Sequence, residues 1–222
     1  MKWSDKIEVT NEDNMQLMSR YPDNYFELAI VDPPYGVGVF TSDGYTSKEG
    51  KRFKSNKLFH DSYAWNKSAP NDKYFKELKR ISKNRIVWGS NYYPYVDGNG
   101  GSLVWYKGDT AKTVSHCEIA SLSFQAKVDF VHIDWQSGFY RVRKEGIQIH
   151  PCQKPVKLYK WLLMNYAKEG DKILDTHLGS GSIALACHEL GFSLTACELD
   201  SEYYDSALKR FKQQTAQLKL KI

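Results

Sequence analysis

Residues 28–36 read LAIVDPPYG, and this stretch decides the fold that the rest of the chain predicts. Four apolar residues run directly into Asp32, Pro33 and Pro34, which predicts a buried strand that stops abruptly. Proline lacks an N–H group and restricts the preceding residue to extended conformations, so the tetrapeptide should form a stiff loop. In open α/β sheets, the carboxyl end of a strand faces the ligand crevice. We therefore expect this loop at a binding site.

The side chains of the loop suit a planar amino group. The Asp32 carboxylate and the Pro33 carbonyl can accept both amino hydrogens, and Pro34 keeps the loop stiff. Tyr35 can stack on the ring that carries the amine, a contact worth about 1–3 kcal/mol for a nucleic-acid base. The alternative interpretation is a strand that ends in a proline turn, with Asp32 as an ordinary turn residue.

The composition is that of a globular protein. A chain of 222 residues is long enough for one domain with a sizeable core. Its net charge of +5 allows a polyanionic partner without requiring one. The four cysteines show no CxxC spacing, so we expect reduced thiols, no metal site and a cytoplasmic location. No apolar run has the length of a membrane span or the form of a signal peptide, so we expect neither secretion nor membrane insertion.

A second motif lies near the C-terminus, where residues 172–182 read KILDTHLGSGS. It predicts a strand, a glycine turn and a helix that begins near Ser182, whose amino end favours an anionic group. The next strand ends at Glu198, 23 residues after Asp175, a spacing typical of an acid that binds ribose hydroxyls. The turn lacks the third glycine of the dinucleotide fingerprint, so a nucleoside ligand without phosphates fits better. A plain βαβ unit is the alternative.

The remaining pattern predicts alternating strands and helices. Asp13 follows a short strand at residues 7–9, and it either borders the same crevice or caps the helix of residues 15–20. Further helices are predicted for residues 72–83, from Pro155 to Gly170, and for residues 200–220. Further strands are predicted for residues 85–88, 103–106, 118–124 and 127–133. Strands that follow one another without a helix indicate antiparallel pairing in this part of the sheet.

Two basic segments are candidates for contact with a nucleic acid. Residues 36–68 are irregular and rich in glycine and lysine, and residues 138–146 carry basic side chains around a tyrosine. In both segments, a solvated surface is the alternative interpretation. The candidate contact residues are Lys51, Arg52, Lys54, Arg141, Arg143 and Lys144.

The order of the motifs carries a resemblance. Asp-Pro-Pro-Tyr precedes the glycine turn by about 140 residues. Residues 150–155, HPCQKP, come directly before the predicted helix that leads into the strand of the second motif. With residues 12–13, 88–93 and 196–200, this arrangement resembles the amino-group DNA methyltransferases that use S-adenosylmethionine, in their permuted β-group order. Cys152 stands where the family usually has threonine, and His177 where it often has phenylalanine. These two departures concern side-chain contacts only.

The resemblance implies an α/β, Rossmann-like class I methyltransferase fold. Its mostly parallel seven-stranded sheet would carry helices on both faces, in one domain over residues 1–222, with DNA-contacting insertions at about 36–68 and 95–148. It implies that Asp32 and Pro33 hold the target amino group while Tyr35 stacks on the base. The implied cofactor-binding set is Asp13 near the adenine, Glu198 at the ribose, and Lys154, Pro155, Asp175, His177, Gly179, Ser180, Gly181 and Ser182 toward the methionine end.

The implied activity is methylation of adenine N6 in double-stranded DNA. Cytosine N4 is the alternative, although the cytosine enzymes more often carry serine in place of Asp32. A DNA-binding relative without catalysis should have a broken motif, and both motifs are intact here. Methylation of an RNA base or of a protein glutamine amide is a further alternative, but the glutamine enzymes favour asparagine at this position. A homodimer and a partner restriction nuclease are compatible with the family.

Overall fold

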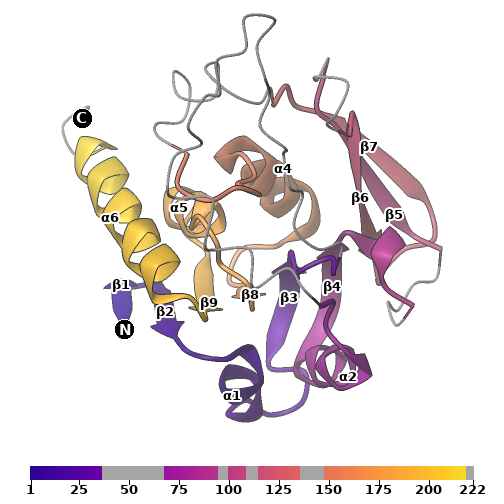
Figure 1. The fold of residues 1–222 in the computed structure, drawn as a ribbon, viewed down its shortest axis with the longest axis horizontal. Coiled ribbons are helices and arrows are strands. Elements are labelled where there is room, and N and C mark those ends of the chain that lie inside the picture. Colours follow the sequence, from indigo (N-terminus) through magenta and orange to yellow (C-terminus); the bar gives the residue numbers. More distant parts are fainter. Residues whose placement is uncertain (37–67, 95–99, 109–114, 136–147, 219–222) are drawn as a thin grey trace, which may run out of the picture.

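A twisted sheet forms the middle layer of the computed structural model, which describes residues 1–36, 68–94, 100–108, 115–135 and 148–218 (Figure 1). Within these residues the sheet has nine strands in the order β1-β2-β9-β8-β3-β4-β6-β5-β7. Their bounds are β1 Lys2–Ser4, β2 Ile7–Asn11, β3 Phe26–Val31, β4 Ser82–Trp88, β5 Ser102–Tyr106, β6 Cys117–Leu122, β7 Val128–His132, β8 Lys172–Asp175 and β9 Ser193–Glu198.

The central strands are parallel, and this decides where the two sequence motifs lie. β3 pairs in parallel with β4 on one side and with β8 on the other, in a register that places Leu28 opposite Ile173. β8 pairs in parallel with β9, and β9 with β2. Because parallel strands end at the same edge of a sheet, the loops after β3 and β8 are neighbours, although about 140 residues separate them in the chain.

The edges of the sheet differ in part from the sequence prediction. The resemblance implies seven strands and the local patterns predict eight, among them residues 127–133, which form the edge strand β7; the short strand β1 at the other edge was not predicted. β6 is antiparallel to β4 and to β5, as strand following strand predicted. That prediction was wrong for β6 and β7, which do not pair, because β7 passes to the far side of β5 and pairs with it in parallel. Pairing across a longer connection is not visible in a local pattern.

Helices cover both faces of the sheet, as expected. α1 (Asn14–Ser19) and α2 (Asp72–Ile81) lie on one face, and α4 (Val156–Tyr166), α5 (Ser182–Leu190) and α6 (Ser201–Leu218) lie on the other (Figure 1). Alternate residues of β3 point into the two layers: Leu28 and Ile30 pack with the second group of helices, and Ala29 and Val31 with the first. Side chains on both faces of β3 are therefore buried, which explains its continuous apolar sequence.

The end of α4 differs from the prediction, and a short 3₁₀ helix follows β4. α4 ends at Tyr166 rather than at Gly170, because Ala167 already has an extended backbone and the chain turns there toward β8. A short 3₁₀ helix, η3 (Ser90–Tyr92), follows β4 and begins after Gly89, whose φ of 69° lies in the left-handed region. Among the described residues, no helix combines the length and the apolar character that crossing a bilayer requires.

Candidate active site

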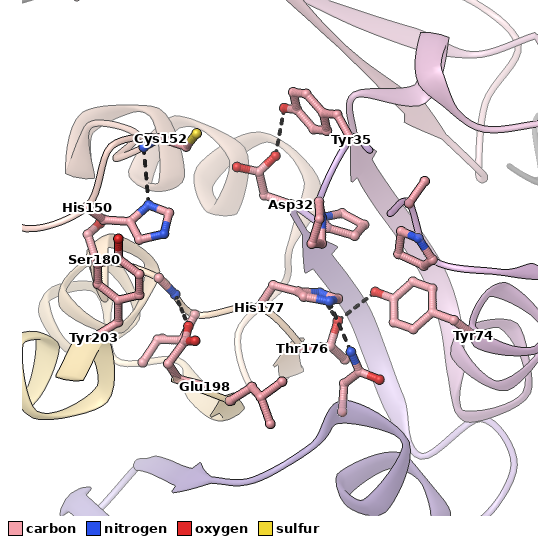
Figure 2. Close-up of a pocket in the computed structure, with 18 of the residues that line it drawn as sticks. Asp32, Tyr35, Tyr74, His150, Cys152, Thr176, His177, Ser180, Glu198 and Tyr203 are labelled. Atoms are coloured by element: carbon pink, nitrogen blue, oxygen red, sulfur yellow. Dashed lines mark hydrogen bonds between the residues drawn. The ribbon is translucent and has the colours of Figure 1, made fainter. Parts of the chain in front are cut away.

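One cavity of about 460 Å³ lies where β2, β3, β8 and β9 end, and both sequence motifs line it. Its volume lies in the range of small-molecule sites. The wall is formed by residues 32–35 after β3, residues 176–180 after β8, Glu198 at the end of β9, residues 152–154 before α4, and Tyr74 of α2. In Figure 2, Asp32 with Tyr35 and Glu198 with Tyr203 lie toward different ends of the pocket, with His177 between them.

Asp32 is held by two hydrogen-bond donors. The Tyr35 hydroxyl donates to Asp32 Oδ1 at 2.8 Å, and the Lys154 ammonium donates to Asp32 Oδ2 (Figure 2 draws the first of these). Burial raises the pKa of the Asp32 carboxyl, and the ammonium opposes this rise. Burial acts to lower the pKa of Lys154, but the Asp32 and Glu118 carboxylates outweigh it and raise that pKa above its usual value. The pair is therefore an ion pair, protected from water.

The Asp-Pro-Pro-Tyr loop is fastened to the residues that follow β4. The Tyr93 hydroxyl donates to the Pro33 carbonyl at 2.6 Å, and the Tyr35 ring stacks on Tyr92 with centroids 4.8 Å apart. A Cβ on Gly89 would lie 2.3 Å from the Tyr35 ring, so only glycine fits there. The Pro33 carbonyl keeps a second lone pair for a ligand, since a carbonyl oxygen can accept two hydrogen bonds.

Lys154 is connected by ion pairs to two charged residues, Glu118 and Lys107, that the sequence analysis did not identify. Its ammonium lies 3.1 Å from Glu118 Oε2 of β6, and Glu118 Oε1 lies 3.1 Å from the Lys107 ammonium after β5. Lys154 and Lys107 are 4% and 6% exposed, which is unusual for lysine. In sequence, both Lys107 and Glu118 look like ordinary strand-end residues, and their burial follows from the position of β6 between β4 and β5.

The glycine turn and Glu198 form the other part of the site. The Gly179 N–H donates to Glu198 Oε2 at 2.8 Å, and the Asp200 N–H donates to Oε1 at 3.0 Å. Gly179 and Gly181 have φ values of 55° and 72°, where a side chain would be strained. Burial raises the pKa of Glu198, while the two backbone donors oppose that change. Each carboxylate oxygen retains a lone pair that can accept a hydroxyl group of a ligand.

Arg210 of α6 holds the glycine turn by hydrogen bonds, a contact that the sequence analysis did not predict. Its Nη1 donates to the Ser180 carbonyl and to Ser182 Oγ, both at 2.9 Å, and Arg210 is 6% exposed. The sequence predicts only a helix for residues 200–220, and nothing local distinguishes this arginine. Its role follows from the packing of α6 against the helices of the same face.

Half of the expected cofactor-binding residues line the cavity, namely Lys154, His177, Gly179, Ser180 and Glu198. The other five do not line it. Asp13 caps α1, accepting from the N–H groups of Met15 and Gln16, which is the alternative that its sequence position left open. Pro155 stands at the N-cap of α4 and Gly181 at that of α5, where no side chain accepts a hydrogen bond. Ser182 meets Arg210, and Asp175 accepts from the His177 N–H at 2.9 Å.

A neutral hydrogen-bonded chain crosses the wall between these ends. Asn14 Nδ2 lies 3.0 Å from His177 Nε2, His177 Nδ1 lies 2.9 Å from Thr176 Oγ1, and the Thr176 hydroxyl lies 2.6 Å from that of Tyr74 (Figure 2). An amide nitrogen only donates, so Nε2 accepts and the imidazole proton sits on Nδ1. Burial lowers the pKa of His177 to about 3, so the ring is neutral at physiological pH.

Two further groups near the turn are also uncharged. His150 Nδ1 accepts from the Cys152 N–H at 3.2 Å, and burial lowers the pKa of His150 to about 3 (Figure 2). Burial raises the pKa of Asp175 to about 8, which favours its protonated form at neutral pH. The cavity therefore combines these neutral side chains with three carboxylates that each have a donor: Asp32 with Lys154, Glu12 with Arg20, and Glu198 with backbone N–H groups. Such a chamber suits a flat, polar, uncharged ring together with a ligand that carries hydroxyl groups.

The candidate DNA-contacting residues lie outside the described ranges. Lys51, Arg52 and Lys54 fall within residues 37–67, and Arg141, Arg143 and Lys144 within residues 136–147. Of the second candidate insertion, residues 95–148, the described part contributes β5, β6 and β7 to the sheet. Among the described residues, no group of three or more His, Cys, Asp or Glu side chains is arranged to hold a metal ion.

Known proteins resemble this chain in sequence. The DNA methylase family model N6_N4_Mtase matches residues 52–209. The type II methyltransferase M2.DpnII of Streptococcus pneumoniae is 24% identical over 93% of this chain and 90% of its own length. M.HpaI of Haemophilus parainfluenzae, also a type II methyltransferase, is 22% identical over 88% of this chain and 71% of its own length.

Solved structures have the same fold. The PvuII DNA methyltransferase, described as cytosine-N4-specific, superposes with a TM-score of 0.62 at 14% identity, covering 94% of this chain and 87% of the other. The complex of M1.HpyAVI with SAM superposes with a TM-score of 0.57 at 18% identity, covering 92% and 99%. At these identities the likeness concerns the fold.

The buried imidazole of His177 predicts a pH effect on stability. Its pKa is about 3 in the folded protein and near 6.5 when unfolded, so the unfolded chain binds more protons between these values. Stability should therefore fall as the pH drops below 6.5, and His177→Phe should make this fall less steep. Urea unfolding at several pH values between about 7 and 4.5 measures the slope. Equal slopes for the wild type and the variant would contradict a neutral, buried His177.

Proposed function

We propose, because the chain belongs to the N6/N4 DNA methylase family whose model spans residues 52–209, that it methylates the exocyclic N6 of adenine in double-stranded DNA. S-adenosylmethionine is the methyl donor of this family. One observation carries the proposal: Asp-Pro-Pro-Tyr borders the same cavity as Glu198 and the glycine turn. An acceptor for an amino group and an acceptor for ribose hydroxyls therefore face a single chamber.

The residues present fit the cofactor. The cavity of about 460 Å³ has room for a nucleoside-sized ligand, and Glu198 presents a carboxylate with free lone pairs at its wall. Gly179 and Ser180 would hold the methionine end, and the uncapped amino end of α5 favours its carboxylate. Asn14 and Met15 line the cavity beside the cap residue Asp13, so this segment would border the adenine.

Asp32 and the Pro33 carbonyl would hold the target amino group. An exocyclic amine is a poor nucleophile because its lone pair is delocalised into the ring. Hydrogen bonds from both amino hydrogens to these two acceptors favour a more tetrahedral nitrogen, whose lone pair then points away from the protein. The bound cofactor supplies a methyl group that its sulfonium charge has already activated. Asp32 then has to accept a proton only after transfer, from the methylated nitrogen.

The base must leave the DNA helix to reach Asp32. Extruding a base requires a few kcal/mol, which stacking on Tyr35 offsets in part. Tyr92 stacks on Tyr35 and is 44% exposed, so it can move aside for the base without uncovering the core. Segments 36–68 and 95–148, with their lysines and arginines, are the proposed contacts to the phosphate backbone. Homodimerisation and a partner nuclease stay predictions.

The identity of the methylated base is the direct test. Purified protein, unmethylated plasmid DNA and S-adenosylmethionine labelled in its methyl group are incubated, and the DNA is digested to nucleosides. The carboxylate at position 32 predicts that the label appears in N6-methyl-2′-deoxyadenosine. Label in N4-methyl-2′-deoxycytidine would assign the protein to the cytosine branch, and label in neither nucleoside would contradict the proposal.

The role of Asp32 predicts a selective defect. Asp32→Asn keeps the size of the side chain but replaces one acceptor oxygen with a donor, so methyl transfer should fall by roughly 100-fold or more. Cofactor binding, measured by calorimetry, should change little. Asp205→Asn, at an exposed position of α6, is the matched control and should retain full activity. A fully active Asp32→Asn enzyme would rule out this role.

The proposed role of Glu198 predicts a defect in cofactor binding. Glu198→Gln retains one oxygen for the backbone donors but loses the charge that strengthens hydrogen bonds to hydroxyl groups, so the Kd for S-adenosylmethionine should rise by roughly 10- to 100-fold. Glu202→Gln changes an exposed side chain four residues later and is the control. Unchanged cofactor affinity in Glu198→Gln would move the ribose to another part of the site.

A further inference from the structure

Two buried lysines and two half-buried carboxylates form a continuous row next to the Asp-Pro-Pro-Tyr loop. In order they are Lys107 after β5, Glu118 of β6, Lys154 before α4 and Asp32 after β3. The Lys107 and Lys154 ammonium groups each lie 3.1 Å from one oxygen of Glu118, and Lys154 also donates to Asp32. We call this set the charge row. It connects the antiparallel part of the sheet to the residue that would hold the target base.

The charge row is electrically balanced. It contains two cations and two anions, and each internal member has a partner on both sides. Removing a single buried ion from water without pairing it is strongly unfavourable, whereas a paired and hydrogen-bonded row is tolerated. The rings of Trp88 and Trp105 lie 5.3 and 5.8 Å from the Lys154 and Lys107 ammonium groups and add a favourable cation–π contact.

The row creates a conflict with substrate binding. In the free protein, Tyr35 donates to Asp32 Oδ1 and Lys154 to Oδ2, so both carboxylate oxygens already have a donor. A target amino group also has to donate to this carboxylate. Each carboxylate oxygen can accept a second hydrogen bond, but the charged Lys154 ammonium is a stronger donor than a neutral amino group and competes with it at Oδ2. Lys154 can give up this contact without losing its charge partner, because Glu118 Oε2 lies 3.1 Å away on its other side.

We propose that the Lys154 ammonium is a placeholder for the target amino group, and that Glu118, held by Lys107, is the counter-ion that retains Lys154 when the base arrives. Glu118 and Lys107 are thus positioning residues, which act on the base through Lys154. This inference rests on the proposed function, since it takes Asp32 as the acceptor of the amino group. It adds the step by which Asp32 becomes available.

The placeholder arrangement predicts opposite effects for its two outer members. Without the Glu118 charge, Lys154 has only Asp32 as a counter-ion and should hold it more tightly against the base. Without Lys107, Glu118 has one cation fewer and should attract Lys154 more strongly, which leaves Asp32 more available. A merely structural role would impair the enzyme in the same direction in both variants.

Steady-state kinetics on unmethylated plasmid DNA tests this difference. For Glu118→Gln we expect kcat/KM for DNA to fall roughly tenfold or more, with the Kd for S-adenosylmethionine unchanged. For Lys107→Met we expect kcat/KM at or above the wild-type value. Glu27→Gln removes a carboxylate that pairs with Lys83 near the start of β3, far along the strand from Asp32, and is the matched control. Full activity in Glu118→Gln, or equal losses in both variants, would overturn the proposal.

A double-mutant cycle tests the row without any activity measurement. Asp32→Asn, Glu118→Gln and the double variant are unfolded in urea. Either single variant leaves Lys154 one carboxylate, but the double variant leaves a buried ammonium with none, so it should lose more stability than the two single variants together. Additive losses would overturn the shared role of Lys154, even if the protein methylates no DNA.

The two proposals fail in different ways. If the wild-type protein transfers no methyl group to DNA, the proposed function is wrong. The double-mutant cycle would still measure the coupling within the charge row. Normal methylation by the wild type together with an inactive Asp32→Asn variant would support the proposed function. The kinetics of Glu118→Gln and Lys107→Met would then show whether Lys154 acts as the placeholder. If Glu118→Gln does not fold, Lys107→Met decides alone, because a large fall in its kcat/KM contradicts the proposal.

Discussion

The parallel pairing of β3 with β8 is the constraint on which the rest of the structure depends. The register that places Leu28 opposite Ile173 brings the end of one strand beside the end of the other. A shift by one residue would exchange the larger Leu28 and Ile30 with the smaller Ala29 and Val31 between the two layers, and both layers would have to repack. Two stretches far apart in the chain thereby share one cavity, and the chemistry of the family follows from their meeting.

Burial of Asp32 imposes a second requirement, which reaches far into the sheet. A carboxylate that is to hold an amino group is most effective away from water, where its hydrogen bonds are strong. That position demands a counter-ion, and Lys154 is itself buried, so Glu118 and Lys107 complete the pairing. The antiparallel strands β5 and β6 thus do more than widen the sheet, because they contribute two of the four charges.

The side of the cavity that we propose for the cofactor follows a different principle. There the backbone binds the charged group, since the N–H groups of Gly179 and Asp200 hold Glu198. The histidines at positions 150 and 177 line the cavity, and desolvation lowers the pKa of each to about 3, so neither would oppose a positively charged sulfonium. His177 stands where the family often has phenylalanine. Its imidazole is also an aromatic ring, but it makes hydrogen bonds with Asn14 and Thr176 that phenylalanine could not make.

The sequence by itself determined the family, the α/β class, the strands that carry the two motifs and the roles expected for Asp32, Tyr35 and Glu198, because each of these depends on a short local pattern. Only the tertiary structure decided that Asp13 caps a helix, that Lys154 faces Asp32, and that Lys107, Glu118 and Arg210 support the site. The physical reason is that the partner of a buried charge is chosen by strand order and helix packing. A lysine or glutamate at a strand end looks the same in sequence whether water or another buried ion neutralises it.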